Sequence, residues 1–289
     1  MQRFEWRLED NIVALHRDLA TGAYHHGPYQ RFIVHDPVRR EIHKASVRDR
    51  LVHHALVRAI EPLFERQFIF DSWACRRGKG THAAVARFQK VAWRRSRNNT
   101  RPVWILKLDI RKCFAAIDHL ILKTILSKTI VDPKILRLIA EIVGSFNTVG
   151  VSGAGLPLGN LSSQLFANVY LNEFDHFVKG ELQLPNYLRY CDDLIYWDRN
   201  RAVLVGALPL IRVFLVDQLK LELHPKKFLL RRYHSGVDIL GFICFPHFRL
   251  LRPATARRVL RRYDSKNAAS YNGLLMHCRS FRLAAMIAQ

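Results

Sequence analysis

Apolar residues recur at helical spacing in several parts of this chain. A Ser-x-x-Asp cap begins at Ser46, and a helix from there to Phe68 is predicted by apolar residues at Val47, Leu51, Ala55, Ile60 and Phe64. A second helix is predicted after the turn GKG, with Thr81 as its cap and arginines at its end. Asp118 and the pair Asp132-Pro133 mark the starts of two more helices.

The second half of the chain continues this helical pattern. A Gly/Pro-rich loop precedes SSQLFANVYLNEFDHFVKGEL, residues 162–182, which predicts a long amphipathic helix. From Arg252 onward the pattern is again helical and is strongly basic.

Apolar, β-rich stretches between these helices predict strands. The run VWILKL, Val103–Leu108, predicts a buried strand with Asp109 at its end. The sequence NYLRYCDDLIYWD, Asn186–Asp198, predicts a strand, a tight turn and a second strand. The run VDILGFICF, between Gly236 and Pro246, predicts a further strand. A small sheet that bears acids and is covered by helices predicts an α+β fold.

Composition narrows the class of protein. The 289 residues are 49% hydrophobic and 24% charged, which is typical of a globular chain. No apolar run reaches the ~18 residues of a membrane span, and the N-terminus lacks the apolar region of a secretory signal, so we expect no membrane partner. The five cysteines are scattered without a Cys-x-x-Cys pair. This argues against a disulfide framework or a zinc cluster and favours a reducing, cytoplasmic location.

Charge points to a polyanionic partner. The chain has 46 Lys and Arg against 24 Asp and Glu, a net charge of +22. Residues 87–107 contain seven basic residues and no acid, and residues 246–289 contain nine basic residues and one acid. Because a merely soluble surface does not require two nearly acid-free segments, we expect the partner to be nucleic acid.

Asp109, Asp192 and Asp193 are acids at the ends of predicted buried strands. A tight turn at 191–193 can bring the adjacent acids toward one site, and a neighbouring strand would add Asp109. Three repelling carboxylates need a counter-charge, and hard oxygen ligands favour two Mg²⁺ ions, with Mn²⁺ as a possible substitute. This arrangement is typical of two-metal phosphoryl transfer. The alternative is that the acids cap turns or pair with arginines, which is a stronger explanation for Asp109 alone than for all three.

Two motifs carry a resemblance to reverse transcriptases. YCDD at 190–193 resembles their Tyr-x-Asp-Asp box, and LKLDIRKCFAAIDH at 106–119 resembles their first acidic motif. The resemblance implies that Asp109, Asp192 and Asp193 are catalytic and that the metal ligands are Asp109, Ile110, Asp192 and Asp193. Phe114 stands in the place of the aromatic steric gate that excludes ribonucleotides.

Three further motifs complete an ordered set across about residues 30–250. HPKKFLL at 224–230 resembles the later Lys motif, and DILGFICF at 238–245 resembles the primer grip. SWACRRGKGTHAAV at 72–85 resembles the fingers motif, which implies that Arg76 contacts the incoming triphosphate. The implied fold is a right-hand polymerase: fingers at 1–102, a palm at 103–250 with an interleaved fingers segment at about 119–155, and a basic helical thumb at 251–289.

A departure from the usual motif suggests the subgroup. Within GLPLGNLSSQLFANVYLNEFD, residues 155–175, Leu158 precedes Gly159 and Gln164 follows Ser163, where most reverse transcriptases carry Gln and Pro. This pattern is similar to that of the reverse transcriptases of diversity-generating retroelements. Such enzymes copy a template-repeat RNA into cDNA with errors mainly opposite adenines, and the cDNA rewrites a variable repeat in a target gene. The implied partners are template RNA, cDNA primer, dNTPs and a small basic pentameric accessory protein, in a bacterial or phage-infected cell.

The resemblance also implies a nucleotide pocket, made of Arg76, Phe114, Leu158, Gly159, Gln164 and Lys226. Leu158 cannot offer the polar contact that a Gln would make with the sugar, so we hypothesise that Leu158, with Arg76, lowers fidelity. Core packing is the alternative role for Leu158. Either Lys226 or Lys227 is a candidate to protonate the pyrophosphate, and the pattern does not choose between them.

Basic side chains outside the pocket are candidate contacts to nucleic acid or to the accessory protein. They lie in a fingers loop and on the helix after Arg252: Arg94, Arg95, Arg97, Arg257, Arg258, Arg261 and Arg262. The competing interpretations are a reverse transcriptase of a retron, group II intron or defence system, and a non-catalytic RNA-binding scaffold. A viral RNA polymerase is disfavoured because Cys191 stands where those enzymes usually have Gly.

Overall fold

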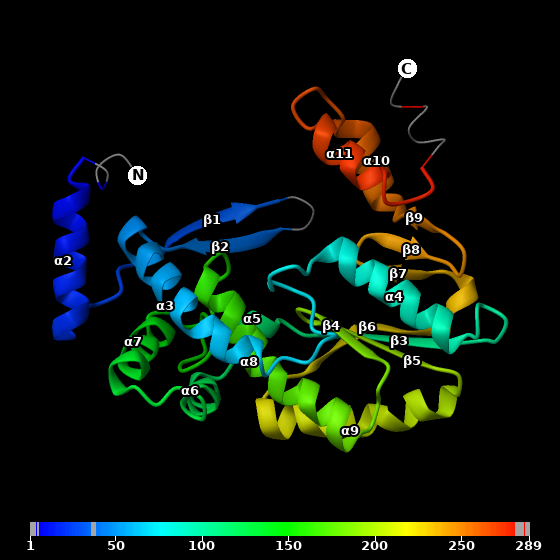
Figure 1. The fold of residues 1–289 in the computed structure, drawn as a ribbon, viewed down its shortest axis with the longest axis horizontal. Helices are drawn as coiled ribbons and strands as arrows, with labels where there is room; N and C mark the ends of the chain where they lie inside the picture. Colours follow the sequence, from blue (N-terminus) through cyan, green and yellow to red (C-terminus); the bar gives the residue numbers. More distant parts are fainter. Residues whose placement is uncertain (1–3, 5, 36–38, 281–285, 287–289) are drawn as a thin grey trace.

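A four-stranded antiparallel sheet lies at the centre of the computed structural model, which describes residues 4, 6–35, 39–280 and 286 (Figure 1). Its strand order is β4 (Tyr187–Tyr190), β5 (Asp193–Asp198), β3 (Trp104–Ile110) and β6 (Leu223–Arg232). The predicted strand after residue 103 and the predicted strand–turn–strand at 186–198 are therefore confirmed. With helices around this sheet, the α+β class is confirmed as well.

Alternation along β3 gives the sheet two different faces. Leu106, Leu108 and Ile110 point into the larger hydrophobic core. The other face begins with Ile105, which joins a second core, and continues with Lys107 and Asp109. One face of the strand is thus wholly apolar, whereas the other changes from apolar to charged along its length.

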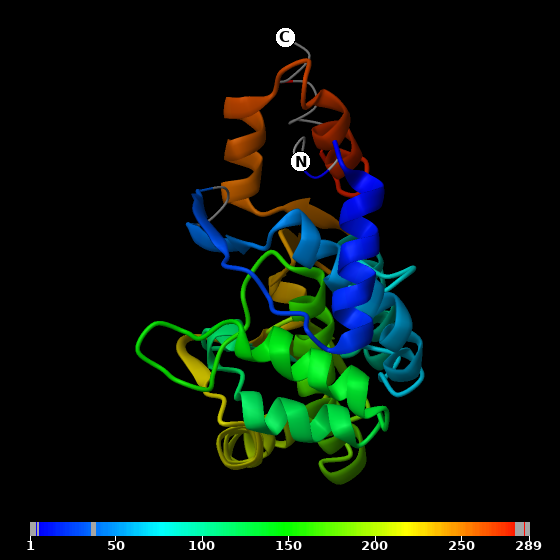
Figure 2. The ribbon, with the colours of Figure 1, turned by 90° about the vertical axis from the view of Figure 1, so that its left-hand side faces the viewer.

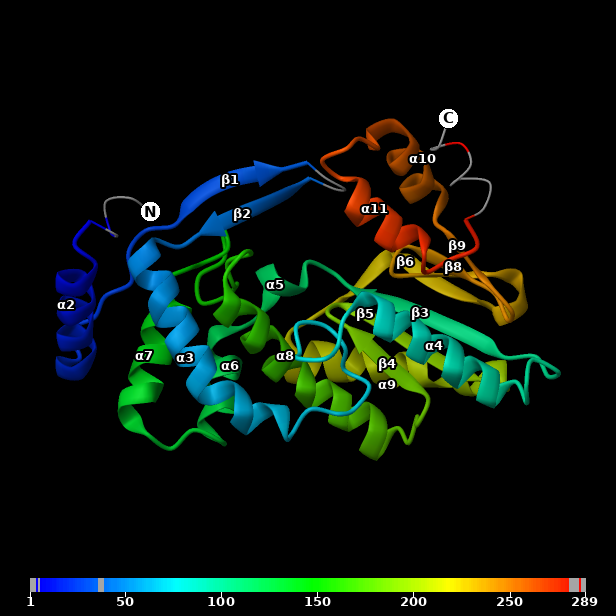
Figure 3. The same ribbon diagram turned by 45° about the horizontal axis from the view of Figure 1, so that its top comes forward.

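Helices cover both faces of the sheet. α8 (Leu161–His176) supplies twelve buried residues, continues as a π-helix over Phe177–Glu181 and packs on α3 and α6. α4 (Thr81–Arg95) and α9 (Arg201–Leu219) lie on opposite sides of the sheet in Figures 1 and 3. The long helix predicted after the Gly/Pro-rich loop is confirmed.

α9 is unusually apolar for a surface helix. Among the described residues it is the one helix that is long and apolar enough to cross a membrane by length and composition, with 28% of the relevant window buried. The expectation that no apolar run is long enough to span a membrane was wrong for α9. Its mean hydropathy stays high although Arg212 and Asp217 interrupt the apolar run. One such helix is weak evidence of a membrane, and α9 covers the sheet with Leu204, Ala207, Ile211, Leu215 and Leu219.

The N-terminal part is helical, with one hairpin. It contains α2 (Leu8–Thr21), the hairpin β1 (Gln30–Val34) and β2 (Arg40–Lys44), and α3 (Val47–Glu65). The Ser46 cap of α3 is confirmed, since its side chain accepts from the Asp49 N–H. Ile60 and Phe64 are buried as the apolar pattern predicted, whereas Leu51 and Ala55 are exposed. The buried side chains of α3 are Asp49, Val52, His53, Leu56, Val57, Ile60 and Phe64.

Caps also fix the helices that follow. The short α5 (Cys113–Ala116) comes after β3. Asp118 and Asp132 cap α6 (His119–Ser127) and α7 (Pro133–Gly144), as expected. Thr81 does not cap α4: Gly80 takes the N-cap position, and the Thr81 hydroxyl lies 3.0 Å from that of Tyr190.

The C-terminal part holds a second small sheet, a basic helix and a helix without charged residues. The single strand expected in VDILGFICF is two, β7 (Val237–Ile239) and β8 (Phe242–Cys244), which pair with each other, and β8 also pairs with β9 (Arg249–Leu251). The expectation missed a turn at Leu240-Gly241, where both residues have positive φ. α10 (Pro253–Arg262) and α11 (Ala268–Leu275) follow and lie above the sheets in Figures 1 and 2.

The boundaries of fingers, palm and thumb stay predictions. β3 begins just after the first predicted boundary, and β9 straddles the second. Residues 1–3, 5, 36–38, 281–285 and 287–289 of the predicted fingers and thumb lie outside the described residues.

Candidate active site

Two acids meet across the central sheet. Asp109 on β3 lies directly opposite Asp193 on β5, so their side chains share one face of the sheet. Asp192 stands in the turn between β4 and β5, where the Ile110 N–H donates to its carbonyl at 3.1 Å. The expected neighbourhood of Asp109, Ile110, Asp192 and Asp193 is therefore present in the backbone.

The turn that carries Asp192 is tight. Cys191 adopts a left-handed conformation, with φ of 51°. The strands close at once on either side of it, because Tyr190 pairs with Asp193. Two residues, Cys191 and Asp192, thus reverse the chain, and the hairpin presents adjacent carboxylates beside Asp109.

Two lysines form ion pairs with two of the acids on this face. The Lys227 ammonium donates to Asp109 Oδ2 at 2.8 Å, and Lys107 Nζ lies 3.1 Å from Asp193 Oδ1. The hydrogen bond to Asp109 raises the pKa of Lys227. Lys227 is thus held as an ammonium ion beside the acids.

Burial raises the pKa of both Asp192 and Asp193. The nearby charge of Asp109 raises both values further, whereas Lys107 acts in the opposite direction on Asp193. Ionisation of all three carboxyls together is therefore unfavourable unless another cation binds beside them.

The donor set fits a divalent metal in its chemistry. Carboxylate oxygens are the ligands that Mg²⁺ and Mn²⁺ prefer. In the described part of the chain, no three His, Cys, Asp or Glu side chains converge closely enough to hold a metal ion as they stand. Lys107 and Lys227 form ion pairs with two of the three acids. Both ammonium groups would therefore have to move before a metal ion could bind.

A small cavity adjoins Asp192. Its lining includes Phe114, from the first acidic motif, and Gln164, from the first turns of α8. Gln164 also lines a wider cavity of about 650 Å³ that extends past Cys75 to Arg77 and Lys79. The structure thus brings two predicted pocket residues, Phe114 and Gln164, together at the acidic turn.

Arg76 reaches this wider cavity, but its guanidinium is engaged elsewhere. Its side chain is only 6% exposed and forms a bidentate pair with Glu65, at distances down to 2.6 Å. It also donates to the carbonyls of Ile69 and Ser72. In this structure Arg76 fastens the loop after α3. The exposed cations of the cavity are Arg58 and Arg77, and Lys79 is half-buried.

The Leu158–Asn160 loop is fixed to the β1–β2 hairpin. The His43 N–H donates to the Leu158 carbonyl at 2.9 Å, and the buried Asn160 side chain donates to the His43 carbonyl at 2.8 Å. Gly159 has φ of +103°, and a Cβ there would lie 2.7 Å from Ile42. Leu158 is half-buried beside this crowded glycine, on a loop that β2 holds in place.

Lys226 and Lys227 differ in their contacts. Both belong to β6, in a segment where the pairing with β3 is irregular between Leu223 and Phe228. Lys227 reaches Asp109, whereas Lys226 is exposed. The geometry therefore favours Lys227 over Lys226, which was the predicted nucleotide contact.

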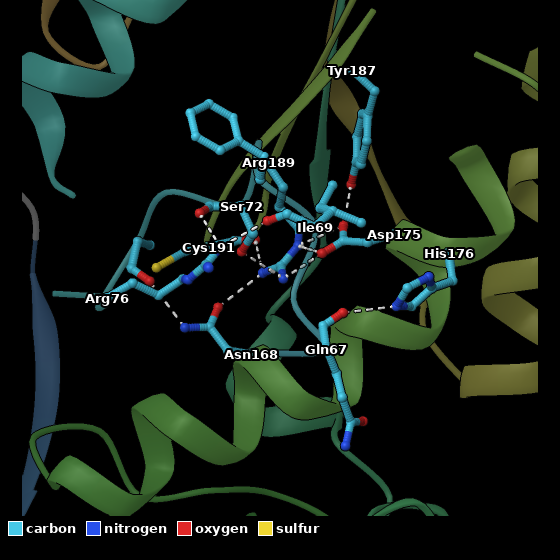
Figure 4. Close-up of polar contacts among 12 residues, drawn as sticks. Gln67, Ile69, Ser72, Arg76, Asn168, Asp175, His176, Tyr187, Arg189 and Cys191 are labelled. Atoms are coloured by element: carbon cyan, nitrogen blue, oxygen red, sulfur yellow. Dashed lines mark hydrogen bonds and ion pairs between the residues drawn. The ribbon is translucent and has the colours of Figure 1, made fainter. Parts of the chain in front are cut away.

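An arginine that the motifs did not single out supports the acidic turn from behind (Figure 4). Arg189 is fully buried and pairs with Asp175 of α8 through two nitrogens, at 2.8 and 2.7 Å. It also donates to Asn168 and to Ser72, each at 3.0 Å. Arg189 thus joins the strand before the turn to α8 and to the loop after α3. In the sequence, the one indication of this role was a charged residue between Leu188 and Tyr190 in an otherwise apolar strand.

The predicted nucleic-acid contacts form two separate groups. Arg94 and Arg97 are exposed at the end of α4, and Arg95 lies 3.7 Å from Asp198. On α10, Arg257, Arg261 and Arg262 are exposed and Arg258 is half-buried. Nothing in the structure tests their contacts with nucleic acid.

Residues 36–244 match the family described as "Reverse transcriptase (RNA-dependent DNA polymerase)". Protein YkfC of Escherichia coli is 28% identical over 200 residues, which cover 67% of this chain and 51% of that protein. The group II intron-encoded protein LtrA of Lactococcus lactis is 26% identical over 177 residues, which cover 59% of this chain and 28% of LtrA. The chain thus spans about half or less of the length of these curated relatives.

Solved structures show the same fold. Apo telomerase from Candida tropicalis superposes with a TM-score of 0.60 at 11% identity, covering 84% of this chain and 51% of that one. Telomerase from Candida albicans, in complex with a fragment of telomeric RNA, superposes with a TM-score of 0.58 at 10% identity, covering 79% and 46%. At these identities the likeness concerns the fold.

Proposed function

Because this chain belongs to the reverse transcriptase (RNA-dependent DNA polymerase) family, we propose that it copies RNA into DNA at the acidic turn of its central sheet. The observation that carries the proposal is the direct pairing of Asp109 with Asp193, beside Asp192 in the turn. Like charges placed opposite each other destabilise a sheet, so their presence argues for a functional role.

Each acid has a role in this proposal. Asp109, Asp192 and Asp193 would hold divalent ions, Mg²⁺ by preference, which when bound activate the attacking 3′-oxygen and stabilise the leaving pyrophosphate. Lys227, already held as an ammonium beside Asp109, would give a proton to the pyrophosphate. The incoming dNTP would lie between Asp192 and the cavity that Gln164 lines.

The nature of the substrate follows from the pocket and the charge. The net charge of +22 favours nucleic acid, and the family makes an RNA template paired with a DNA primer the expected form. Phe114, beside Asp192 in the small cavity, would crowd the 2′-position of a ribonucleotide and so favour dNTPs.

We further propose that the chain is the reverse transcriptase of a diversity-generating retroelement. This subtype rests on Leu158 and Gln164 in the loop and first turns of α8. The substrate would then be a template-repeat RNA, and the product an adenine-mutagenised cDNA for mutagenic retrohoming. The partner would be a small basic pentameric accessory protein, in the cytoplasm of a bacterium or phage-infected cell.

The error spectrum tests the subtype. Extension of a DNA primer on an RNA template, with and without the accessory protein, should give substitutions concentrated opposite template adenines. The control template has the same length and its adenines replaced by other bases, and its products should carry few errors. Errors spread evenly over all template bases would contradict the subtype while leaving the polymerase proposal intact.

A second candidate is a group II intron-like reverse transcriptase. It is favoured by the relative LtrA, whose printed description is a group II intron-encoded protein. In that case synthesis should be accurate at adenines and should not respond to an accessory protein.

A further inference from the structure

Three of the five cysteines gather at the acidic turn. Cys75, Cys113 and Cys191 line the small cavity beside Asp192. Cys75 is exposed, Cys191 is half-buried and Cys113 is buried. Burial raises the pKa of the Cys113 thiol to about 12, which leaves it in the unreactive form. Cys75 and Cys191 are therefore the two cysteines of this cavity that solvent can reach.

Cys75 and Cys191 line the same small cavity, and the interaction between their side chains shifts the pKa of both thiols. Their contact is set by the backbone, because Ser72 and Arg189 form a parallel β-bridge just before them. The Trp73 N–H donates to the Arg189 carbonyl at 2.9 Å, and the Arg189 N–H donates to the Asp71 carbonyl at 2.9 Å. The segments that lead to Cys75 and Cys191 are more than 100 residues apart in the sequence, and they lie side by side just before the two cysteines.

Buried side chains fix the same alignment. The Arg189 guanidinium donates to Ser72 Oγ at 3.0 Å, and the Asn168 amide donates to the Ala74 carbonyl at 2.9 Å. Figure 4 shows Cys191 at the edge of this network, beside Ser72 and Arg76. Because the flanking residues on both segments are held, the two sulfur atoms are kept near each other.

We propose that Cys75 and Cys191 are a redox modification site, at which a peroxide converts the paired thiols into a reversible disulfide. The bond would join the loop after α3 to the turn that carries Asp192. Its formation follows from the cysteine geometry alone, whereas its effect on activity rests on the proposed polymerase function.

The chemistry balances with hydrogen peroxide as the oxidant. The Cys75 thiolate attacks one peroxide oxygen, the O–O bond breaks, and hydroxide leaves to take up a proton as water. The Cys191 sulfur then attacks the Cys75 sulfenic acid, the S–S bond forms, and a second water leaves. A reduced dithiol reverses the reaction by thiol–disulfide exchange and becomes the oxidised partner.

Cys75 is suited to the first step. The interaction with the Cys191 side chain lowers the pKa of the Cys75 thiol to about 7, and the Arg189 charge lowers it further against the effect of burial. The Cys75 thiol therefore ionises more readily than an unperturbed cysteine. This fits a reducing compartment, where disulfides are transient and redox-sensing.

The bond would disturb the acidic site. A disulfide holds its sulfurs about 2.05 Å apart, closer than any hydrogen-bonded pair of thiols. Cys191 would have to shift toward Cys75 and carry Asp192 with it. Because a displacement of ~1 Å can lower a rate by about 100-fold, we expect oxidation to switch synthesis off.

Mapping the thiols after oxidation tests the site directly. The full chain is treated with graded hydrogen peroxide, its free thiols are blocked with N-ethylmaleimide, and its non-reduced peptides are examined by mass spectrometry. We expect a Cys75–Cys191 cross-linked peptide that dithiothreitol removes. Cys75→Ser should abolish it, and the matched control Cys278→Ser, in the thumb, should retain it. A chain that forms no Cys75–Cys191 bond, or that links Cys75 to Cys113, overturns the proposal.

Primer extension then tests the consequence. Each variant is compared with its own reduced form, so that any effect of the substitution cancels. Wild type and Cys278→Ser should lose at least 10-fold in rate on oxidation and recover with dithiothreitol, whereas Cys75→Ser should change less than twofold. Equal activity with and without the bond would overturn the switch. Bond formation in a chain whose reduced form makes no DNA would support the site and count against the proposed function instead.

Discussion

Asp109 and Asp193 lie directly opposite each other across β3 and β5, and each of them faces a lysine. A cross-strand pair of like charges destabilises a sheet, and burial makes the repulsion stronger. Lys227 and Lys107 reduce this repulsion, but burial and, to a smaller extent, the charge of Asp109 still raise the pKa of Asp193. The site is therefore a place where the fold gives up stability to keep acids together.

Removing one acid should stabilise the protein and inactivate it. We expect Asp193→Asn to raise the melting temperature at pH 7 in the absence of divalent ions, because the neutral amide ends the repulsion with Asp109. The same variant should lose polymerase activity. Calorimetry and primer extension check the two effects. A lower melting temperature would show that the Lys107 pair outweighs the repulsion.

The pH dependence of this effect has a definite sign. The folded-state pKa of Asp193 is raised above the ordinary value of 3.8, so the folded protein binds that proton more tightly than the unfolded chain does. This contribution to stability is complete below pH 3.8 and is lost as the pH rises through the raised pKa. The stability difference between wild type and Asp193→Asn should grow over that range and then level off.

Lys227 should matter more for catalysis than its neighbour Lys226. We expect Lys227→Ala to lower kcat by about 100-fold, the scale of a lost general acid. Lys226→Ala, the matched control at the neighbouring exposed lysine of β6, should change kcat by less than about threefold and act mainly on KM. Single-turnover rates with saturating dNTP separate these effects. An equal loss in both variants would argue against a proton donor at 227.

Arg189 should be required to hold the acidic turn. Arg189→Met leaves Asp175 charged and buried without its partner, which should lower the free energy of unfolding by about 3–5 kcal/mol. Lys128→Met, which breaks the exposed pair with Glu173, should cost under about 1 kcal/mol. Urea unfolding measures both. Partial recovery in Arg189→Met with Asp175→Leu would assign the loss to the buried charge, and no recovery would assign it to the other partners.

Leu158→Gln should reduce misincorporation. A polar side chain at this position would give the sugar of the incoming nucleotide a contact that Leu158 cannot make, and a contact specific to the correct geometry increases discrimination. Sequencing of cDNA from matched RNA templates measures the error frequency, for which we expect a decrease of several-fold. An unchanged error frequency would contradict a role of Leu158 in fidelity and leave it as a packing residue.

The sequence predicted local structure well and long-range partners poorly. The β-rich pattern predicted β3, β4 and β5, and the Asp-led starts predicted α6 and α7, because these depend on neighbours in the chain. The pairing of Asp109 with Asp193 joins residues 84 positions apart, and no local pattern reports it. The motifs assigned both acids to one expected metal site, but the register of β3 against β5 came only from the structure.

Charge partners were the least predictable feature. Arg76 was assigned to a triphosphate by its motif, yet it pairs with Glu65, a residue that no motif includes. Lys226 and Lys227 could not be separated until the structure showed Lys227 in contact with Asp109. In VDILGFICF, the apolar run hid a turn because Leu240, a residue that disfavours positive φ, adopts it before Gly241.

The most direct test of the account is Mg²⁺-dependent extension of a DNA primer on an RNA template, comparing wild type with Asp192→Asn. Native gels and circular dichroism establish that both proteins are folded, and each is assayed with and without the accessory protein. The account predicts dNTP- and Mg²⁺-dependent synthesis by wild type and a loss of at least 1,000-fold in the variant, on the scale of lost metal-assisted catalysis. Equal synthesis by the two proteins, or none by a folded wild type on its native RNA, would contradict it.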